Sequence, residues 1–261
     1  MPAVLPSAPS SSRPYGATRT PAALLLGLLG LLALLGACAS SDAEAPATTS
    51  ADAEQSVAPG ANERFLDPEL DLEQCLETFE GESREVAVAR AAITAQLELQ
   101  AGEDVADIGA GTGLYMLPLA QAVGSEGKVY AVDISPRFIE HLEQRAQDAG
   151  LSHVSVVECS ERSAELPPDS VDAVFICDTY HHFEYPQSTL ASLRKALRPG
   201  GRLVVVDFER IPGVSREWIL GHVRIGREDT IAEIEAAGFE FVDQPAIDGL
   251  EENYLIRFTS P

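Results

Sequence analysis

The stretch of this 261-residue chain with the clearest chemistry is a loop in which glycines alternate with other residues after an acid. Asp107, Gly109, Gly111 and Gly113 form the pattern D-x-G-x-G-x-G at the end of a short apolar run that reads as a strand. Glycine tolerates positive φ and has no Cβ, so a ligand can lie against such a loop. From Leu114 the chain reads as a helix, whose first N–H groups point at whatever the loop binds.

A second acidic residue stands at the end of the next predicted strand. Lys128 to Ile134 reads as this strand, and Asp133 lies near its carboxyl end, twenty residues after Gly113. A carboxylate in this place can accept hydrogen bonds from both hydroxyls of a ribose. A nicotinamide dinucleotide site needs G-x-G-x-x-G, and Leu114 stands where its third glycine would be. The two elements predict a nucleoside ligand, and the glycine spacing disfavours a nicotinamide dinucleotide.

Two further motifs give the chain a family resemblance. One is Leu197-Arg-Pro-Gly-Gly-Arg-Leu-Val-Val-Val-Asp207, and the other is Leu166-Pro-Pro-Asp-Ser-Val-Asp-Ala-Val-Phe175. With the glycine loop and Asp133, their order resembles the class I S-adenosylmethionine (SAM) methyltransferases over residues 84–258. The resemblance is nearest to the broad group that contains the ubiquinone/menaquinone biosynthesis methyltransferases. It implies SAM as the cofactor and a doubly wound, mostly parallel, seven-stranded α/β sheet with a Rossmann-like fold.

The resemblance also implies which residues hold the cofactor. In the family the glycine loop packs against the amino-acid end of SAM, and an acid a few positions before the Leu-Pro pair often holds the adenine. Here Arg162 and Ser163 occupy that neighbourhood, with Glu158, Glu161 and Glu165 around them, so the adenine contact stays open. The candidate cofactor-binding residues are Asp107, Gly109, Ala110, Gly111, Gly113, Asp133, Ile134, Glu158 and Ser163.

The acceptor side of the site is expected after the fourth predicted strand, in Cys177-Asp-Thr-Tyr-His-His-Phe183. Related enzymes place residues of this segment against the transferring methyl group. The candidates for acceptor binding and proton removal are Asp178, Tyr180, His181 and His182. Histidine titrates near neutrality and suits a general base if the acceptor is a hydroxyl or an acidic carbon. The alternative for each histidine is a structural hydrogen bond to a loop backbone.

Beyond the fifth strand, His222 and Arg224 are candidate acceptor-binding residues. Trp218, Ile219 and His222 share a helical face that either lines the acceptor pocket or packs against the core. An alternative is a metal site made of Asp178, His181 and His182, but adjacent histidines tend to point different ways. No metal is predicted.

The predicted reaction is an in-line displacement on the sulfonium methyl group of SAM by a small-molecule acceptor. Because the methyl group is already activated, the enzyme has mainly to align acceptor, methyl carbon and sulfur. The alternative is a lipid-anchored protein that keeps the fold and binds SAM or another metabolite without turnover. The conflict between an exported domain and a cofactor made in the cytoplasm is the reason to keep this alternative.

The sequence predicts how the elements that position these residues are arranged. Strands and helices alternate from residue 104 to residue 237, which is typical of a doubly wound sheet with ligands at the carboxyl ends of its strands. The predicted strands are 104–108, 128–133, 153–158, 171–177, 202–207, 239–242 and 254–258. The predicted helices of the sheet are 114–124, 136–149, 187–197 and 228–237. Ahead of them, within residues 63–100, a short helix from Phe65 and a longer one over 84–97 are expected to cover the sheet.

The N-terminal quarter of the chain divides into a predicted export signal and a predicted tether. Ala22 to Ala37 is an apolar run of sixteen residues after two arginines, shorter than the roughly 20 residues of a membrane span. Leu35-Gly-Ala-Cys38 resembles a bacterial lipobox, which implies lipidation at Cys38. Residues 1–38 are therefore predicted to be a lipoprotein signal, 39–62 a disordered tether and 63–261 the methyltransferase domain. The protein is expected on the periplasmic side of a membrane, with Ala39 favouring an outer membrane; the alternative is an uncleaved inner-membrane anchor.

The net charge bears on the binding partners of the protein, and the cysteine count bears on its disulfides. The net charge of −23 repels phosphate backbones, so no nucleic acid partner is expected, and a solvated acidic surface is the plain explanation. Besides Cys38 the chain has Cys75, Cys159 and Cys177, an odd number. Cys177 is expected to be a small buried residue, and a Cys159–Cys177 bridge is the less favoured alternative to free thiols.

Overall fold

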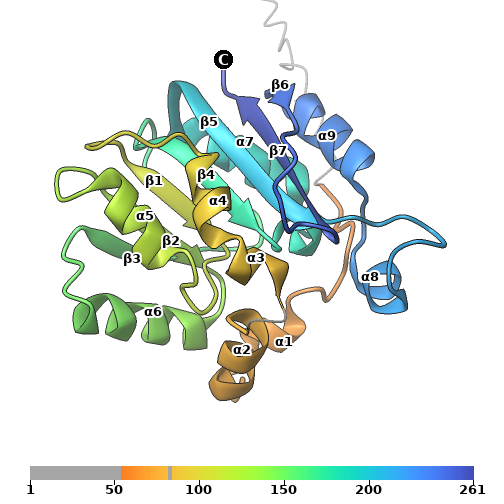
Figure 1. The fold of residues 1–261 in the computed structure, drawn as a ribbon, viewed down its shortest axis with the longest axis horizontal. Helices are drawn as coiled ribbons and strands as arrows, with labels where there is room; N and C mark the ends of the chain where they lie inside the picture. Colours follow the sequence, from red (N-terminus) through yellow and green to blue (C-terminus); the bar gives the residue numbers. More distant parts are fainter. Residues whose placement is uncertain (1–53, 82–83) are drawn as a thin grey trace, which may run out of the picture. The chain divides into compact units, whose positions relative to one another are not determined.

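The computed structural model describes residues 54–81 and 84–261, so the predicted signal and most of the predicted tether lie outside the described residues. The described part contains a seven-stranded sheet in the order β3-β2-β1-β4-β5-β7-β6 (Figure 1). Five strands are parallel, and β7 is antiparallel to both of its neighbours. This confirms the predicted doubly wound, mostly parallel α/β sheet.

The predicted strands form within one residue of their expected bounds, except that the strand predicted over 202–207 begins five residues earlier, at Leu197. They are β1 (Val105–Ile108), β2 (Val129–Asp133), β3 (Val154–Glu158), β4 (Val171–Cys177), β5 (Leu197–Phe208), β6 (Glu240–Asp243) and β7 (Asn253–Thr259). The central strands are continuous apolar runs because helices cover both faces of the sheet. β1 and β4 lie side by side although the chain leaves them in opposite directions along the sheet. Ligands of open α/β sheets bind at such a switch point.

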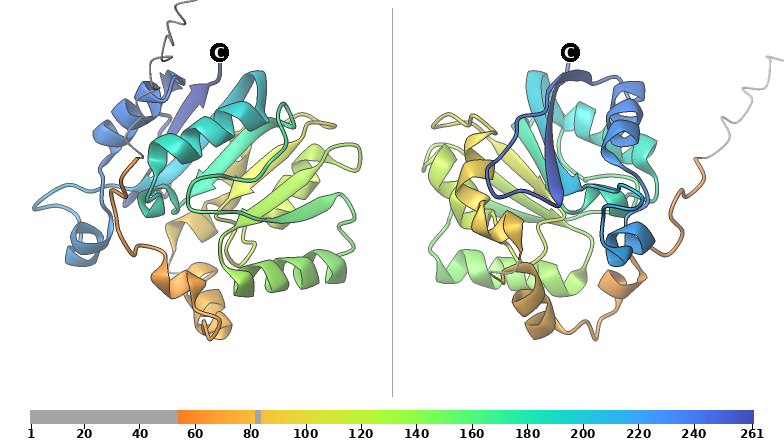
Figure 2. Two further views of the ribbon diagram at one scale, coloured as in Figure 1. Left: turned by 180° about the vertical axis from the view of Figure 1, so that it is seen from behind. Right: turned by 45° about the vertical axis from the view of Figure 1, so that its right-hand side comes forward.

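The helices divide between the two faces of the sheet (Figure 2). The bounds are α1 (Glu63–Leu66), α2 (Leu72–Phe79), α3 (Glu85–Val88), α4 (Arg90–Ala95), α5 (Met116–Val123), α6 (Pro136–Asp148), α7 (Pro186–Ala196), α8 (Glu217–His222) and α9 (Arg227–Ala236). Side chains of α7 and α9, such as Leu190 and Ile234, pack on one face. Ile93 of α4 and Leu119 of α5 pack on the other. Within the described residues, no helix is both long and apolar enough to cross a membrane.

The predicted helix over 84–97 is wrong in one respect, because it is two short helices, α3 and α4, that meet at Ala89. The carbonyl of Val86 accepts a hydrogen bond of 2.9 Å from the Tyr115 hydroxyl. This tertiary contact uses an acceptor of the α3 turn. The break leaves Val86 and Ile93 buried, as the periodicity of the segment requires.

The last part of the predicted tether, residues 54–62, is packed against the domain rather than disordered. The Glu54 carboxylate accepts hydrogen bonds of 2.8 Å from the backbone N–H groups of Gln187 and Ser188, at the start of α7. Glu184 accepts hydrogen bonds from Ser56 and from the backbone of Gly60. Composition did not predict this docking because the segment is held by polar contacts at a helix N-terminus and not by apolar residues.

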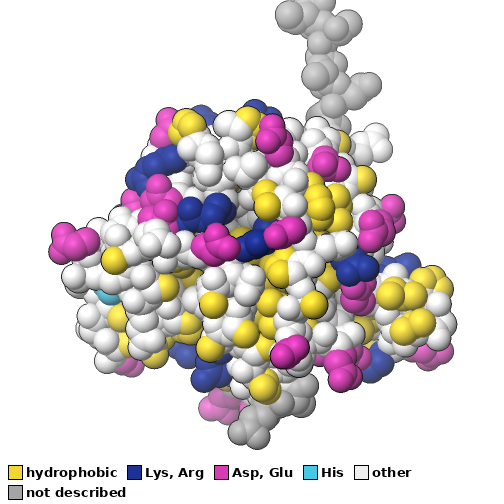
Figure 3. Space-filling view, turned by 45° about the horizontal axis from the view of Figure 1, so that its top comes forward, with side chains coloured by type: hydrophobic (Ala, Val, Ile, Leu, Met, Phe, Trp, Pro, Cys, Tyr) yellow, Lys and Arg dark blue, Asp and Glu magenta, His cyan; other side chains and the backbone are white. Residues whose placement is uncertain are grey.

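Ion pairs join neighbouring elements at the surface. Arg198 bridges Asp104 and Asp172, and Arg257 pairs with Asp243. On the face shown in Figure 3, basic side chains lie beside acidic ones. The acidic excess of the chain is thus partly compensated locally, and such exposed pairs each contribute about 0–1 kcal/mol.

Candidate functional site

Acidic residues collect where four neighbouring strands end. Asp107 lies in β1, Asp133 ends β2, Asp178 follows β4 and Asp207 lies near the end of β5. The first three line a cavity of about 1080 Å³ that runs from the glycine loop to α8. The sheet topology therefore brings residues from distant parts of the chain to one edge.

The three glycines of the loop have different tasks. A Cβ on Gly109 would lie 2.3 Å from the Thr179 side chain, and one on Gly113 would lie 3.0 Å from Leu142. These two glycines permit the loop to pack on the end of β4 and on α6. A Cβ on Gly111 would meet only ordinary contacts, the nearest at 3.8 Å, and Gly111 lines the cavity. Gly111 is therefore the position at which a ligand can approach the backbone.

Two backbone N–H groups fix the Asp133 carboxylate beside the glycine loop. Its carboxylate accepts hydrogen bonds of 2.7 Å from the Gly111 N–H and 2.8 Å from the Ser135 N–H. Each carboxylate oxygen has a further lone pair for a ligand. Burial raises the pKa of Asp133 to about 6, while the N–H donors oppose the shift. Burial and the nearby charge of Asp133 raise the pKa of Asp107 to about 7. Two buried acids in one cavity favour a ligand that carries positive charge and hydroxyl groups.

The residues that could contact the adenine of SAM lie on one side of the cavity. Cys159, Ser160, Glu161 and Ser163 line it. Arg162 instead stacks over Tyr185 at 3.5 Å from the ring centroid and is exposed. The predicted contact Glu158 is exposed at the end of β3 and does not line the cavity. Gly113 does not line the cavity either, so the structure places these two predicted cofactor contacts outside it.

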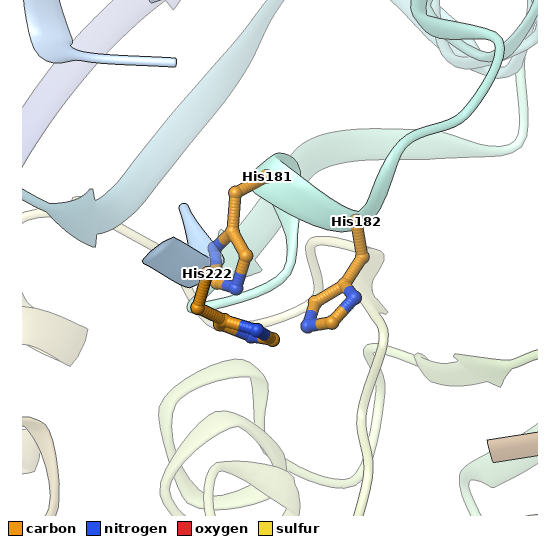
Figure 4. Close-up of side chains that lie close together, drawn as sticks. All are labelled: His181, His182 and His222. Atoms are coloured by element: carbon orange, nitrogen blue, oxygen red, sulfur yellow. The ribbon is translucent and has the colours of Figure 1, made fainter. Parts of the chain in front are cut away.

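Three histidines that line the cavity form a cluster in which their rings lie close together (Figure 4). His181 and His182 come from the short 3-10 turn η1 (Tyr180–His182), and His222 comes from the end of α8. His181 is 3% exposed, and its Nδ1 lies 2.7 Å from Asp207 Oδ1. Its buried Nε2 has no hydrogen-bond partner within the described residues. The structure thus adds Asp207, which sequence analysis did not name as a site residue.

Other aromatic side chains enclose the cluster. The ring of His222 stacks on Trp218, with centroids 4.9 Å apart, and Trp218 contacts Phe208 at 5.3 Å. Phe65, from α1, contacts His182 at 5.3 Å. Ile219 packs into the core with Phe208 and does not line the cavity. The acceptor end of the cavity is therefore largely aromatic.

Three predicted acceptor-side residues have structural tasks. The hydroxyl of Tyr180 donates to Glu233 at 2.7 Å, and Arg224 pairs with the same carboxylate at 2.7 Å. Tyr180 and Arg224 do not line the cavity. Asp178 does, but its carboxylate is paired with Arg84 and accepts a hydrogen bond of 2.5 Å from Asn253. A carboxylate held in this way is a poor proton acceptor, and the side chains of Tyr180 and Arg224 are engaged with Glu233.

Both cavity thiols are free. Within the described residues, Cys75, Cys159 and Cys177 form no disulfide. Burial raises the pKa of Cys159 and of Cys177 to about 12, so both stay protonated at neutral pH. Cys177, predicted to be a small buried residue, is half-buried at the cavity wall and packs against the core.

Comparisons with known proteins agree with this site. Residues 106–205 match the sequence model of the family described as "Methyltransferase domain". The chain is 30% identical over 116 residues to the ubiquinone/menaquinone biosynthesis C-methyltransferase UbiE of Marinomonas sp., covering 44% of this chain and 46% of that protein. It is also 30% identical to the UbiE of Burkholderia mallei, over 45% of this chain and 48% of that protein. The chain thus spans about half the length of these curated relatives.

Solved structures show the same fold. A SAM-dependent methyltransferase from Aquifex aeolicus superposes with a TM-score of 0.64 at 22% identity, over 73% of this chain and 99% of that one. The geranyl diphosphate C-methyltransferase of Streptomyces coelicolor superposes with a TM-score of 0.57 at 16% identity, over 80% of this chain and 91% of that one. The sheet, the glycine loop with Asp133 and these matches together show a methyltransferase domain over residues 106–205 with the fold of the class I SAM-dependent methyltransferases, and they support S-adenosylmethionine as the cofactor.

Proposed function

We propose that the protein transfers a methyl group from SAM to a small, largely apolar acceptor with an ionisable hydroxyl or an acidic carbon. The observation that carries this is one continuous cavity, with the glycine loop and Asp133 at one end and the histidine cluster at the other. An acceptor lying against the histidines would face the cofactor end directly. Such alignment is the main contribution an enzyme makes to methyl transfer.

The residues of the chain divide the work. SAM supplies an activated methyl group, and Asp133 and the glycine loop would hold its ribose and amino-acid portions. His181 accepts the proton of the acceptor at Nε2, because Asp207 holds the Nδ1 side of its ring. Burial and the charges of His181 and His222 lower the pKa of His182 to about 3, so His182 stays neutral.

The acceptor class follows from the cavity wall. Phe65, Phe208 and Trp218 give the acceptor end an apolar, aromatic surface. The names of the curated relatives place those proteins in ubiquinone and menaquinone biosynthesis as C-methyltransferases. Both observations support a lipophilic ring compound. The net charge of −23 disfavours a nucleic acid acceptor.

The deciding test is isotope transfer. Purified protein is incubated with SAM that carries a labelled methyl group and with lipid and aqueous fractions of a cell extract. The proposal predicts label in a product of the lipid fraction. A protein that binds SAM tightly in calorimetry yet labels neither fraction would contradict it and favour the non-catalytic alternative.

The affinity for SAM should depend on pH in one direction. Asp107 and Asp133 have pKa values of about 7 and about 6 without a ligand, so they gain charge as the pH rises from 5 to 8. Because SAM is a cation, its Kd should fall over this interval by about tenfold, which corresponds to about one pKa unit of linkage. Calorimetry over a pH series measures this. The Asp107→Asn variant should give a flatter curve, and an unchanged slope would exclude Asp107 as its source.

We further propose that the domain is anchored to the periplasmic side of a membrane by acyl chains on Cys38. The support is the apolar run before Cys38 and its lipobox-like context. Labelled palmitate fed to expressing cells should enter the natural chain and not the Cys38→Ser variant. Equal labelling of both would exclude this lipidation and favour an uncleaved apolar anchor.

A further inference from the structure

The three histidines at the acceptor end of the cavity lie close enough to share one ligand. One nitrogen of each ring of His181, His182 and His222 lies within 4.8 Å of the others. The three rings converge, with centroids 4.3 to 5.0 Å apart (Figure 4). Adjacent histidines usually point apart, and here the η1 turn aims both rings at α8. Three of the five histidines of the chain therefore meet at one point.

Hydrogen bonds on the far sides of two rings leave their other nitrogens available. Nδ1 of His181 donates to Asp207 at 2.7 Å, and Nδ1 of His182 donates to the Ala61 carbonyl at 3.2 Å. In a neutral imidazole with Nδ1 protonated, Nε2 carries a lone pair. The Nε2 of His181 is buried and has no partner within the described residues, which is costly unless a ligand occupies it. This arrangement of a carboxylate or carbonyl behind each ring is typical of metal-binding histidines.

A buried carboxylate behind one of the rings favours a cation at this place. Asp207 is 1% exposed and stands behind His181, where its negative charge would offset part of the charge of an ion.

We propose that His181, His182 and His222 form a Zn²⁺ site whose fourth coordination position opens into the acceptor end of the cavity. Three imidazoles plus one open position is the ligand set of catalytic zinc sites. Tetrahedral zinc brings the nitrogens of two ligands to about 3.4 Å from each other, from Zn–N bonds of about 2.0–2.1 Å. The rings must close by about 1.4 Å at most, and His222 can supply this movement because its side chain is exposed on a six-residue helix.

Zinc binding at these histidines does not depend on the proposed function. Only the role of the ion in methyl transfer rests on that function. The two roles of His181 exclude each other: without the ion its Nε2 lone pair accepts the proton of the acceptor, and with the ion bound that lone pair is coordinated. An acceptor hydroxyl bound at the open position would instead lose its proton to water because the ion lowers its pKa. The acceptor class then narrows to one with a hydroxyl oxygen that can coordinate zinc.

The test measures metal binding without any acceptor. The full chain is stripped with a chelator, desalted, and titrated with ZnCl₂ by calorimetry and with CoCl₂ by visible absorption. One bound ion per chain is expected, with the Co²⁺ bands of a four-coordinate site. His222→Ala should weaken Zn²⁺ binding at least about 100-fold, and Asp207→Asn, which leaves the three ligands in place, about 10- to 100-fold.

His153→Ala is the matched control, because this ring contacts the Ala120 carbonyl and does not line the cavity. It should bind Zn²⁺ as the unmodified chain does. Equal Zn²⁺ affinity in the unmodified chain and His222→Ala would overturn the site. If the unmodified chain does not bind zinc but still transfers methyl groups, the zinc proposal is refuted and the proposed function stands. If the chain binds zinc and SAM but transfers no methyl group, the proposed function is refuted and the metal site stands.

Discussion

Replacing His181 by glutamine should lower the rate of methyl transfer by about 10² to 10⁴-fold, the usual contribution of a positioned acid–base group. The Kd for SAM should stay within about twofold, because His181 makes its hydrogen bonds to Asp207 and not to Asp133 or the glycine loop. His181 combines three properties: it is buried, its Nδ1 is held by Asp207, and its Nε2 has no partner within the described residues. The rate is measured as transfer of label to the methylated product under saturating SAM.

Two comparison variants make this result interpretable. Asp207→Asn should also slow transfer, because it changes which nitrogen of His181 is protonated. His153→Ala, whose ring contacts the Ala120 carbonyl, should transfer at the normal rate. Full activity in a folded His181→Gln variant would assign His181 a structural role and contradict the proton-transfer assignment.

Replacing Asp133 by alanine should weaken SAM binding by at least about 100-fold. The substitution removes the hydrogen bonds that the two ribose hydroxyls would donate to the Asp133 carboxylate. Each such hydrogen bond contributes about 1.5–3 kcal/mol. The loss of acceptors for Gly111 N–H and Ser135 N–H adds to the effect by loosening the loop. Calorimetry with SAM measures the affinity, and circular dichroism checks that the variant is folded.

A second variant separates the ribose contact from the loop. In Gly111→Ala the added Cβ meets protein atoms no closer than 3.8 Å but projects towards the cavity, and φ of +56° costs about 1 kcal/mol. This variant should also lose affinity with Asp133 intact. Asp248→Ala, in the exposed loop before β7, should bind normally. Normal affinity in Asp133→Ala would refute the assignment of the ribose contact.

The sheet was predictable because its signals are local. β4 was predicted with its observed bounds, and the ends of α6 and β2 moved by one residue. Apolar runs, proline at the start of α6 and glycines at turns act over a few residues, so they can be read along the chain. The segments that were wrong, the broken 84–97 helix and the docked 54–62 stretch, depend on hydrogen bonds to Tyr115 and to the start of α7.

The site was only half predictable for the same reason. The glycine loop and Asp133 were found because loop geometry and strand ends have local signatures. The partner of His181 was not, although Asp207 near the end of an apolar strand run was visible in the sequence. Neighbouring parallel strands end at the same edge, so an acid near the end of β5 could have been paired with the segment after β4.

By itself, the sequence determined the fold class of this protein, and it predicted the glycine loop and Asp133 as the cofactor-binding elements. Only the tertiary structure decided which side chains of Cys177-Asp-Thr-Tyr-His-His-Phe183 face the cavity. The η1 turn directs Tyr180 to Glu233 in the opposite sense to His181, and the positive φ of 49° at Asp178 sets where that turn begins. A single turn sends adjacent side chains to different surroundings, and what each one meets comes from strands and helices far away in the chain. Convergence of His222 with His181 and His182 is therefore a property of packing, which no local pattern encodes.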